Sequence, residues 1–134
     1  MVPKELEGNP RRKPPEPAAG HSDIGTWFGQ LMPNLQPIVR ELDKTIRAVV
    51  LDLTFAVKSK RAFYGRPALG WIIEVAPYDV SINVVFLGGA GFDRPPPLGS
   101  TGRTRYVKLS SLAEVTRPAM VDWIDQAGRT PGWT

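Results

Sequence analysis

The sequence predicts an α+β domain in which helices pack on one antiparallel sheet of four to six strands. Two changes of hydrophobic period lead to this prediction. Between residues 24 and 50, apolar side chains recur every three or four positions, which is the period of a helix with one buried face. Between residues 53 and 109 the period falls to two, as in half-buried strands, and a helical period returns over residues 118–127.

Two helices are expected before the sheet. The first begins at Ser22 or Asp23, since either side chain can accept a hydrogen bond from a free backbone N–H, and it ends before Pro33. The second has Pro37 in its first turn, where a missing N–H does no harm, and it ends near residue 51. Its predicted buried face consists of Leu35, Ile38, Leu42, Ile46, Val49 and Val50.

The strands are expected over residues 53–58, 62–64, 71–76, 80–87 and 104–109. Segment 62–64 is either a continuation of the first strand or a second strand. The glycine- and proline-rich loop over residues 88–103 is long for a compact domain, and such loops are often functional. Ser111 and Glu114 have the spacing of a capping box, and Pro118 begins a final helix.

Residues 1–20 are predicted to form a disordered, proline-rich, basic tail, and residues 21–134 a single domain. The tail holds five prolines and no aromatic residue, so it cannot bury enough apolar surface to offset the entropy lost on ordering. Its run over residues 14–17, Pro-Pro-Glu-Pro, has the composition of a polyproline ligand, and an unselected solvated extension has the same composition.

The composition removes several classes of chemistry. The chain has no cysteine, so disulfides, thiolate metal sites and thiol nucleophiles are excluded. His21 is the one histidine, which leaves no intrachain histidine-ligated zinc or iron site, and a Ser-His-Asp site would depend on this residue alone. No apolar run is long enough to span a membrane and no signal-peptide core is present, so a cytoplasmic protein is expected. The net charge of +4 is too small to indicate a nucleic-acid binder.

The candidate binding residues combine bases with aromatic rings. Lys58 and Tyr64 fall on one parity of the first strand region, and Arg105 and Tyr106 lie on the strand after the long loop. Trp71 begins a predicted strand and is either a ligand contact or part of the core. Bases interleaved with aromatic rings can bind phosphates and stack on rings. The same side chains can equally form a solvated face on which Lys and Arg stems cover apolar surface.

Acidic residues offer two further hypotheses. Glu41, Asp43 and Asp52 are the candidate ligands of a carboxylate metal site, since hard cations accept oxygen ligands alone. Glu41 and Asp43 are two residues apart and so lie on different faces, and Asp43 has the spacing to pair with Arg47 on the exposed side of the helix. Glu74 lies within an apolar strand, where it is either half of a catalytic carboxylate pair or a solvated residue on the outer face of the sheet.

Five segments of the chain agree in order and local pattern with a known family. These segments are Asp52–Lys58, Ala62–Gly65, Trp71–Leu87, Arg105–Leu112 and Arg117–Pro118. Over roughly residues 33–127 the chain thereby resembles the YdhG/YdeI-like family of small bacterial proteins, which is named as a domain of unknown function. The resemblance implies a frataxin-like sandwich of helices on an antiparallel sheet. Some relatives are described as iron chaperones that bind iron through acids of the first helix and strand, a region where this chain also carries Arg40, Lys44 and Lys58 among its acids.

Together these observations predict a non-enzymatic cytoplasmic binding domain of the YdhG-like family. The ligand is expected to be an anionic small molecule or an acidic protein surface, bound on the exposed sheet face by Lys58, Tyr64, Trp71, Arg105 and Tyr106. The alternatives that stay open are a frataxin-type iron chaperone, a small enzyme with a carboxylate pair, and a weak nucleic-acid binder. No cofactor is expected except iron under the first alternative, and an exposed strand edge is compatible with a homodimer.

Overall fold

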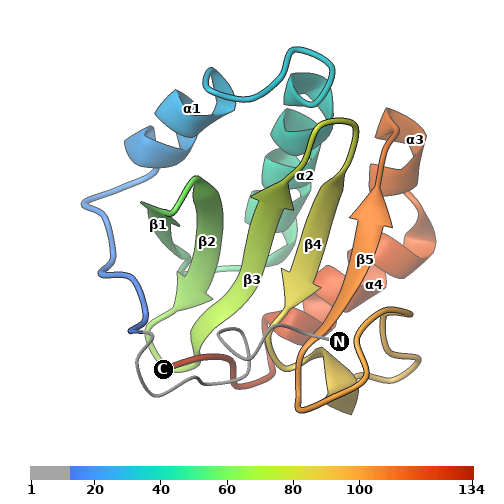
Figure 1. Ribbon diagram of the computed structural model, residues 1–134. Helices are drawn as coiled ribbons and strands as arrows, with labels where there is room; N and C mark the ends of the chain where they lie inside the picture. Colours follow the sequence, from blue (N-terminus) through green and yellow to red (C-terminus); the bar gives the residue numbers. More distant parts are fainter. Residues whose placement is uncertain (1–12) are drawn as a thin grey trace.

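The strands of this protein form one antiparallel sheet in the order β1-β2-β3-β4-β5, in which each strand pairs with its neighbours along the chain. The structure is a computed structural model that describes residues 13–134, and this part of the chain contains four helices and five strands (Figure 1). The strands are β1 (Thr54–Lys58), β2 (Arg61–Arg66), β3 (Gly70–Pro77), β4 (Ile82–Phe86) and β5 (Arg105–Leu109). The α+β class predicted from the sequence is confirmed.

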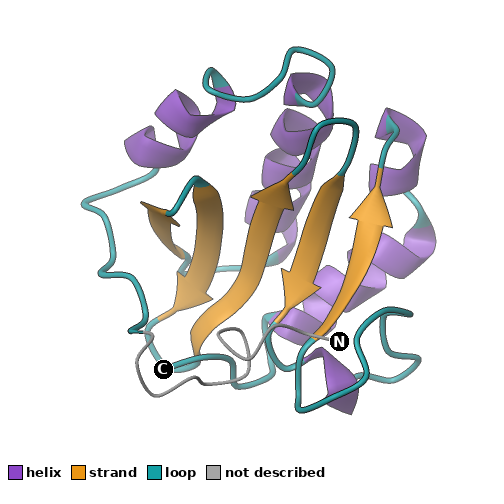
Figure 2. Ribbon diagram, viewed as in Figure 1, coloured by secondary structure: helices purple, strands orange, loops and turns teal. Residues whose placement is uncertain are grey.

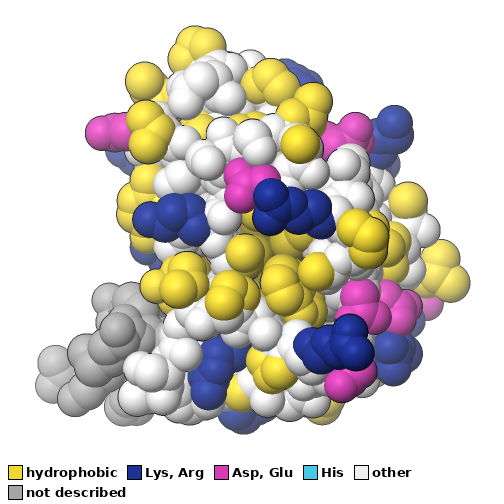
Figure 3. All heavy atoms as spheres, turned by 90° about the vertical axis from the view of Figure 1, so that its right-hand side faces the viewer, with side chains coloured by type: hydrophobic (Ala, Val, Ile, Leu, Met, Phe, Trp, Pro, Cys, Tyr) yellow, Lys and Arg dark blue, Asp and Glu magenta, His cyan; other side chains and the backbone are white. Residues whose placement is uncertain are grey.

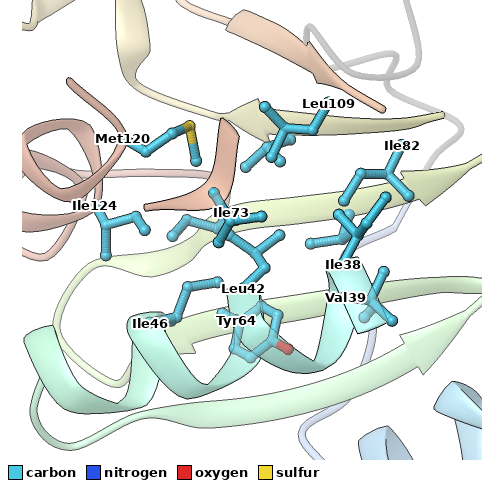
Figure 4. Close-up of a cluster of buried hydrophobic side chains, with 14 of the residues drawn as sticks. Ile38, Val39, Leu42, Ile46, Tyr64, Ile73, Ile82, Leu109, Met120 and Ile124 are labelled. Carbon is cyan, nitrogen blue, oxygen red and sulfur yellow. The ribbon is translucent and has the colours of Figure 1, made fainter. Parts of the chain in front are cut away.

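Three of these helices cover one face of the sheet, and the fourth lies beside the edge strand β1. Helices α2 (Gln36–Val49), α3 (Leu112–Val115) and α4 (Pro118–Ala127) lie on one face, and α1 (Ser22–Phe28) lies beside β1 (Figures 1 and 2). The core fills the space between helices and sheet, where the predicted apolar stripe of α2 is buried (Figure 4). Its labelled members are Ile38, Val39, Leu42, Ile46, Tyr64, Ile73, Ile82, Leu109, Met120 and Ile124.

The helix ends follow local rules that the sequence displays. Pro37 lies in the first turn of α2, and the capping box of Ser111 and Glu114 starts α3, as predicted. The predicted cap of α1 is wrong, because His21 occupies the N-cap position without a side-chain cap hydrogen bond and Ser22 is already helical. None of the helices within residues 13–134 is both long enough and apolar enough to cross a membrane.

A two-residue turn separates β1 from β2. Ser59 and Lys60 both have positive φ, 54° and 64°, which is the conformation of the tight hairpin turns that match the twist of the flanking strands. Lys58 therefore lies directly opposite Arg61. Segment 62–64 is thus part of a second strand that runs antiparallel to the first, and this reversal decides which of its side chains share a face with Lys58.

The long loop over residues 88–103 folds back on the outer edge of β5. A 3-10 turn, η2 (Gly89–Gly91), begins it, and Leu98 exchanges two main-chain hydrogen bonds of 3.0 Å with Tyr106. Seen from this side, hydrophobic side chains are interspersed with basic and acidic ones (Figure 3). The loop thus covers part of the strand edge on which the expectation of a homodimer depends, and that expectation stays a prediction.

Residues 13–20 pass beside β1 before α1 begins (Figure 1). The Ala18 N–H donates a hydrogen bond of 2.8 Å to the carbonyl oxygen of Phe55 on β1. This part of the predicted tail is therefore attached to the sheet, because hydrogen bonds to the domain compensate for its small apolar surface. Residues 1–12 lie outside the described residues, and the prediction of disorder for them stays a prediction.

Candidate functional site

The sheet face opposite the helices is the candidate site and is called the back face below. From the strand register, its members include Ala56, Lys58, Arg61, Phe63, Trp71, Glu74, Asn83, Val85, Leu87, Tyr106 and Lys108. The hydrophobic ones form two clusters that are separate from the main core. Trp133 packs against both clusters, so the C-terminal segment is part of this face.

The structure brings three of the five predicted binding residues to the back face and places the other two elsewhere. Lys58 is exposed on β1, Trp71 is buried at the start of β3, and Tyr106 is half-buried on β5. Trp71 is thus part of a buried cluster, one of the two roles expected for it. Tyr64 and Arg105 point to the helix side of the sheet.

Tyr64 is a core residue, and its prediction as a ligand contact is wrong. The tight turn after Lys58 reverses the chain, so the even-numbered residues of β2 face the helices rather than the back face. The Tyr64 hydroxyl donates a hydrogen bond of 2.7 Å to the Asp43 carboxylate in the buried interior. Burial raises the pKa of Tyr64 well above its ordinary value, and the adjacent Asp43 charge raises it further.

Arg105 supports the long loop instead of a ligand surface, so this prediction is also wrong. Its position in β5 is opposite Phe86, on the helix side of the sheet. Its guanidinium donates to the carbonyl oxygens of Thr104 at 2.8 Å and Gly102 at 3.2 Å. A guanidinium engaged with carbonyl groups of its own loop has fewer donors to offer an anion.

Three aromatic rings of the back face, Phe63, Trp71 and Trp133, pack together toward the end of the sheet at which β3 begins, and they are called the aromatic cradle. Phe63 lies 6.0 Å from Trp71 and 6.3 Å from Trp133, measured between ring centroids. Trp71 and Trp133 also exchange main-chain hydrogen bonds of 2.8 and 2.9 Å. The C-terminal strand-like pairing therefore holds the cradle together.

Two glycines make the cradle possible. The Trp71 ring lies over Gly65, where a Cβ atom would come within 2.8 Å of the ring. At Gly132, a Cβ atom would collide with the Trp71 carbonyl oxygen. Side chains at these two positions are thus incompatible with the observed path of the chain, because such contacts are shorter than packed atoms tolerate.

The cradle and Lys58 together hold the N-terminal segment of residues 13–18. The Trp71 indole Nε1–H donates a hydrogen bond of 3.0 Å to the carbonyl oxygen of Pro15, which is buried. The Lys58 ammonium donates one of 2.9 Å to the carbonyl oxygen of Lys13. Both contacts are made by side-chain donors to main-chain acceptors, so the back face binds a peptide backbone in this structure.

A buried ion pair lies next to the cradle. Glu74 is fully buried, and its Oε2 atom is 2.7 Å from the Arg61 guanidinium. The expectation that Glu74 is a solvated strand residue is therefore wrong. Its neighbours across the sheet, Phe63 and Val85, carry no second carboxylate, and its partner Arg61 is a cation. The Arg61 guanidinium therefore compensates the charge of the buried carboxylate, as in a buried ion pair.

Basic side chains gather at one end of the back face. By register, Lys58, Arg61, Asn83 and Lys108 form one row across the sheet, with Ala76 between the second and third. Lys58 and Lys108 are exposed, at the two edges of the sheet. The Oδ1 atom of Asn83 is buried without a hydrogen-bond partner among the described residues. This end therefore favours an acidic ligand.

The three candidate metal ligands do not converge. Asp43 is buried between α2 and Tyr64, whereas Asp52 follows the end of α2, is mostly exposed and lies 3.6 Å from Arg66. Across residues 13–134, no group of three or more His, Asp or Glu side chains is placed to hold a metal ion. The frataxin-type iron site thus gains no support from the geometry of Glu41, Asp43 and Asp52.

A polar cluster at Asp43 was not foreseen from the sequence. Its carboxylate lies 2.9 and 3.1 Å from His21 Nε2, 3.5 Å from Arg47 and 2.7 Å from the Tyr64 hydroxyl. The expected pairing with Arg47 is present, but Asp43 is buried and not on the exposed side. The sequence feature that predicts this burial is the spacing of Asp43 from Val39 and Ile46, which places it on the buried stripe of the helix.

Comparison with known proteins finds no matching family model, no matching curated protein and no matching solved structure.

Proposed function

We propose that this chain is a non-enzymatic cytoplasmic binding domain whose back face binds an acidic segment of a partner protein. The observation that carries the proposal is the pair of hydrogen bonds from Trp71 and Lys58 to main-chain carbonyl oxygens of residues 13–18. Donors that hold one segment by its backbone can hold another, since every peptide offers the same carbonyl groups.

The charge of the back face supports an acidic partner. Among the strand residues of this face, Lys58 and Lys108 are the exposed charged groups, while the carboxylate of Glu74 is buried and paired with Arg61. Acidic side chains on a bound segment would meet these two ammonium groups at the sheet edges. Complementary charges at the rim of an interface accelerate association and select the partner.

A protein segment fits the structure better than an anionic small molecule does. A hollow of about 520 Å³ lies at the turns of the β1–β2 and β3–β4 hairpins, lined by Trp27, Lys60, Tyr78 and Asp79 among others. It contains one cation and one anion, so it offers no net positive charge for an anion. The back face instead already holds a peptide segment through Trp71 and Lys58. Aromatic residues are enriched where proteins bind one another.

The family membership is a proposal as well. Its support is the order of elements within residues 13–134, in which two helices precede an antiparallel meander and two helices follow it. This order agrees with what the YdhG-like resemblance implies.

Binding of an alternating Glu-Ala peptide, followed by tryptophan fluorescence at low salt, tests the proposed function. The Lys58→Glu/Lys108→Glu variant should bind about tenfold more weakly than the parent chain, since two attractive rim charges become repulsive. Lys44→Glu, on the exposed side of α2, is the matched control and should lower affinity little. Equal affinities of the back-face variant and the parent, or an equal loss in the control, would refute the proposal.

A further inference from the structure

We propose that the partner segment bound by the back face is proline-rich, and that residues 13–18 of this chain compete with it for the aromatic cradle. This inference rests on the proposed function and adds the class of the partner and the regulation of the site. The segment that the structure shows on the cradle is itself proline-rich, since residues 13–18 read Lys-Pro-Pro-Glu-Pro-Ala.

The chemistry of the contacts matches a proline-rich backbone. Trp71 and Lys58 offer only N–H donors, and they meet the carbonyl oxygens of Pro15 and Lys13. A proline has a carbonyl acceptor but no N–H, so a run of prolines needs donors from its receptor and leaves no main-chain donor unsatisfied there. Recognition of polyproline segments by aromatic grooves uses the same complementarity, with little conformational entropy left to lose.

Strand addition does not describe how the segment is held. Within the described residues its one main-chain hydrogen bond to the sheet runs from Ala18 N–H to Phe55 at 2.8 Å. A strand added at the β1 edge would continue this pattern along the edge, which Pro14 and Pro15 prevent because they lack N–H groups. The segment is therefore held mainly by side chains of the sheet.

Burial along the segment indicates which position anchors it. Pro15 is buried at Trp71, whereas Lys13, Glu16 and Pro17 are exposed. A partner peptide would place a proline at the Pro15 position and its acidic side chains outside. The exposed Glu16 next to the anchor shows that an acid is compatible with that register.

The segment has a large competitive advantage because it is tethered. Only a few residues separate Pro15 from the start of α1 at Ser22. A short tether gives an effective concentration in the millimolar range, so a peptide in solution must bind tightly or arrive at high concentration to displace it. Weakening the tethered segment should therefore increase the affinity for a peptide in solution.

The test uses the full chain and a synthetic peptide with the sequence of residues 13–19, monitored by NMR of the indole N–H signals. Replacing Pro14 and Pro15 with glycine weakens the tethered segment by about twofold to fivefold per position, through the added freedom of the unbound chain. The Pro14→Gly/Pro15→Gly variant should therefore bind the peptide about tenfold more tightly than the parent. If the affinity of this variant for the peptide equals that of the parent, residues 13–18 do not compete for the cradle.

Two substitutions identify the site in this glycine background. Trp71→Phe removes the indole donor and should abolish saturable binding, and Lys58→Met tests the second donor if Trp71→Phe fails to fold. Trp123→Phe is the matched control, because its Nε1–H also donates to a main-chain carbonyl, that of Arg94 at 2.7 Å, away from the cradle. The assignment of the site would be refuted if Trp123→Phe lost peptide binding. It would also be refuted if neither Trp71→Phe nor Lys58→Met weakened peptide binding.

Further peptide-binding experiments distinguish failure of this inference from failure of the proposed function. A peptide with alanine in place of each proline should bind at least about tenfold more weakly, and equal binding would refute the proline preference. If the Glu-Ala peptide binds with the expected lysine dependence while the proline peptide does not bind, the inference fails and the function stands. If neither binds, both fail. A parent dimer that the glycine substitutions convert to a monomer would show that the segment occupies a second copy, which contradicts the intramolecular competition.

Discussion

The buried hydrogen bond between Tyr64 and Asp43 makes a quantitative prediction about stability. Tyr64→Phe removes a hydroxyl that donates to a buried carboxylate at 2.7 Å and leaves the ring in place. A hydrogen bond to a charged group contributes about 1.5–3 kcal/mol. The free energy of unfolding at neutral pH should therefore fall by about 2 kcal/mol. With the urea dependence of a domain of this size, the midpoint should fall by about 1 M.

The pH dependence gives a second signature of the same interaction. The folded-state pKa of Tyr64 is raised by burial and by Asp43, so the folded state holds its proton above the pH at which the unfolded chain loses it. This stabilisation is fully present below the ordinary tyrosine pKa, about 10, and is lost as the pH rises toward the folded-state pKa. The stability difference between parent and variant should shrink by up to about 1.4 kcal/mol per pH unit above pH 10.

Urea unfolding followed by tryptophan fluorescence, at neutral pH and above pH 10, measures both effects. Tyr78→Phe is the control, because this side chain is half exposed and its loss should change stability by less than about 0.5 kcal/mol. The reasoning is refuted if Tyr64→Phe and Tyr78→Phe cost the same, or if the difference between Tyr64→Phe and the parent is constant across the alkaline range.

Two further substitutions test the architecture of the back face. Arg61→Ala removes the guanidinium 2.7 Å from the fully buried Glu74 and should lower the free energy of unfolding by about 3 kcal/mol; a change below about 0.5 kcal/mol would contradict a buried pair. Gly132→Ala forces a methyl group onto the Trp71 carbonyl and should destabilise the chain by about 1–3 kcal/mol in thermal unfolding, whereas Gly91→Ala, where a Cβ atom meets nothing within 4 Å, should be nearly neutral. Equal melting temperatures for these two glycine variants would show that the C-terminal segment does not lie on β3.

The fold was largely predictable because hydrophobic period reports directly on the local structure. The apolar stripe of α2 buries most of the side chains that the helical period selects. In β4 the alternation holds only in part, because Val85 on the opposite face is buried as well and Val80, before the strand, is exposed. The ends of elements were also predictable where a rule for backbone hydrogen bonds applies, as at Ser111 and Glu114. Periodicity does not show which side chains of one strand share a face of the sheet with those of the next strand.

The unknown assignment of side chains to the two faces accounts for the wrong predictions of Tyr64 and Arg105 as binding residues. Tyr64 and Lys58 share a face only if the strand continues straight through Ser59 and Lys60, whereas the turn there reverses the chain. Lys58, on the first strand before the turn, lies on the back face. Arg105 and Tyr106 are consecutive residues of one strand, so their side chains point to opposite faces, with Tyr106 on the back face and Arg105 on the helix side.

The remaining features depend on partners that the sequence does not reveal. Glu74 is buried because Arg61 lies close enough to compensate its charge, and the Phe63 ring lies beside it across the sheet. Residues 13–18 have the composition of a disordered segment and are nevertheless held, because Trp71 and Lys58 supply the donors that their carbonyl groups need. Composition predicts whether a segment is ordered by itself, and it does not predict the hydrogen bonds that the rest of the domain makes to that segment.

The most direct measurement of the central claim is an NMR test of the contact between Trp71 and Pro15 in the full chain. The hydrogen bond of 3.0 Å predicts a nuclear Overhauser effect between the Trp71 indole N–H and the protons of residues 15 and 16, and slow exchange of that N–H with solvent. Addition of the proline-rich peptide should weaken this intramolecular effect as the segment is displaced. An indole N–H of Trp71 that exchanges as in an unfolded chain and shows no effect to these residues would contradict the account.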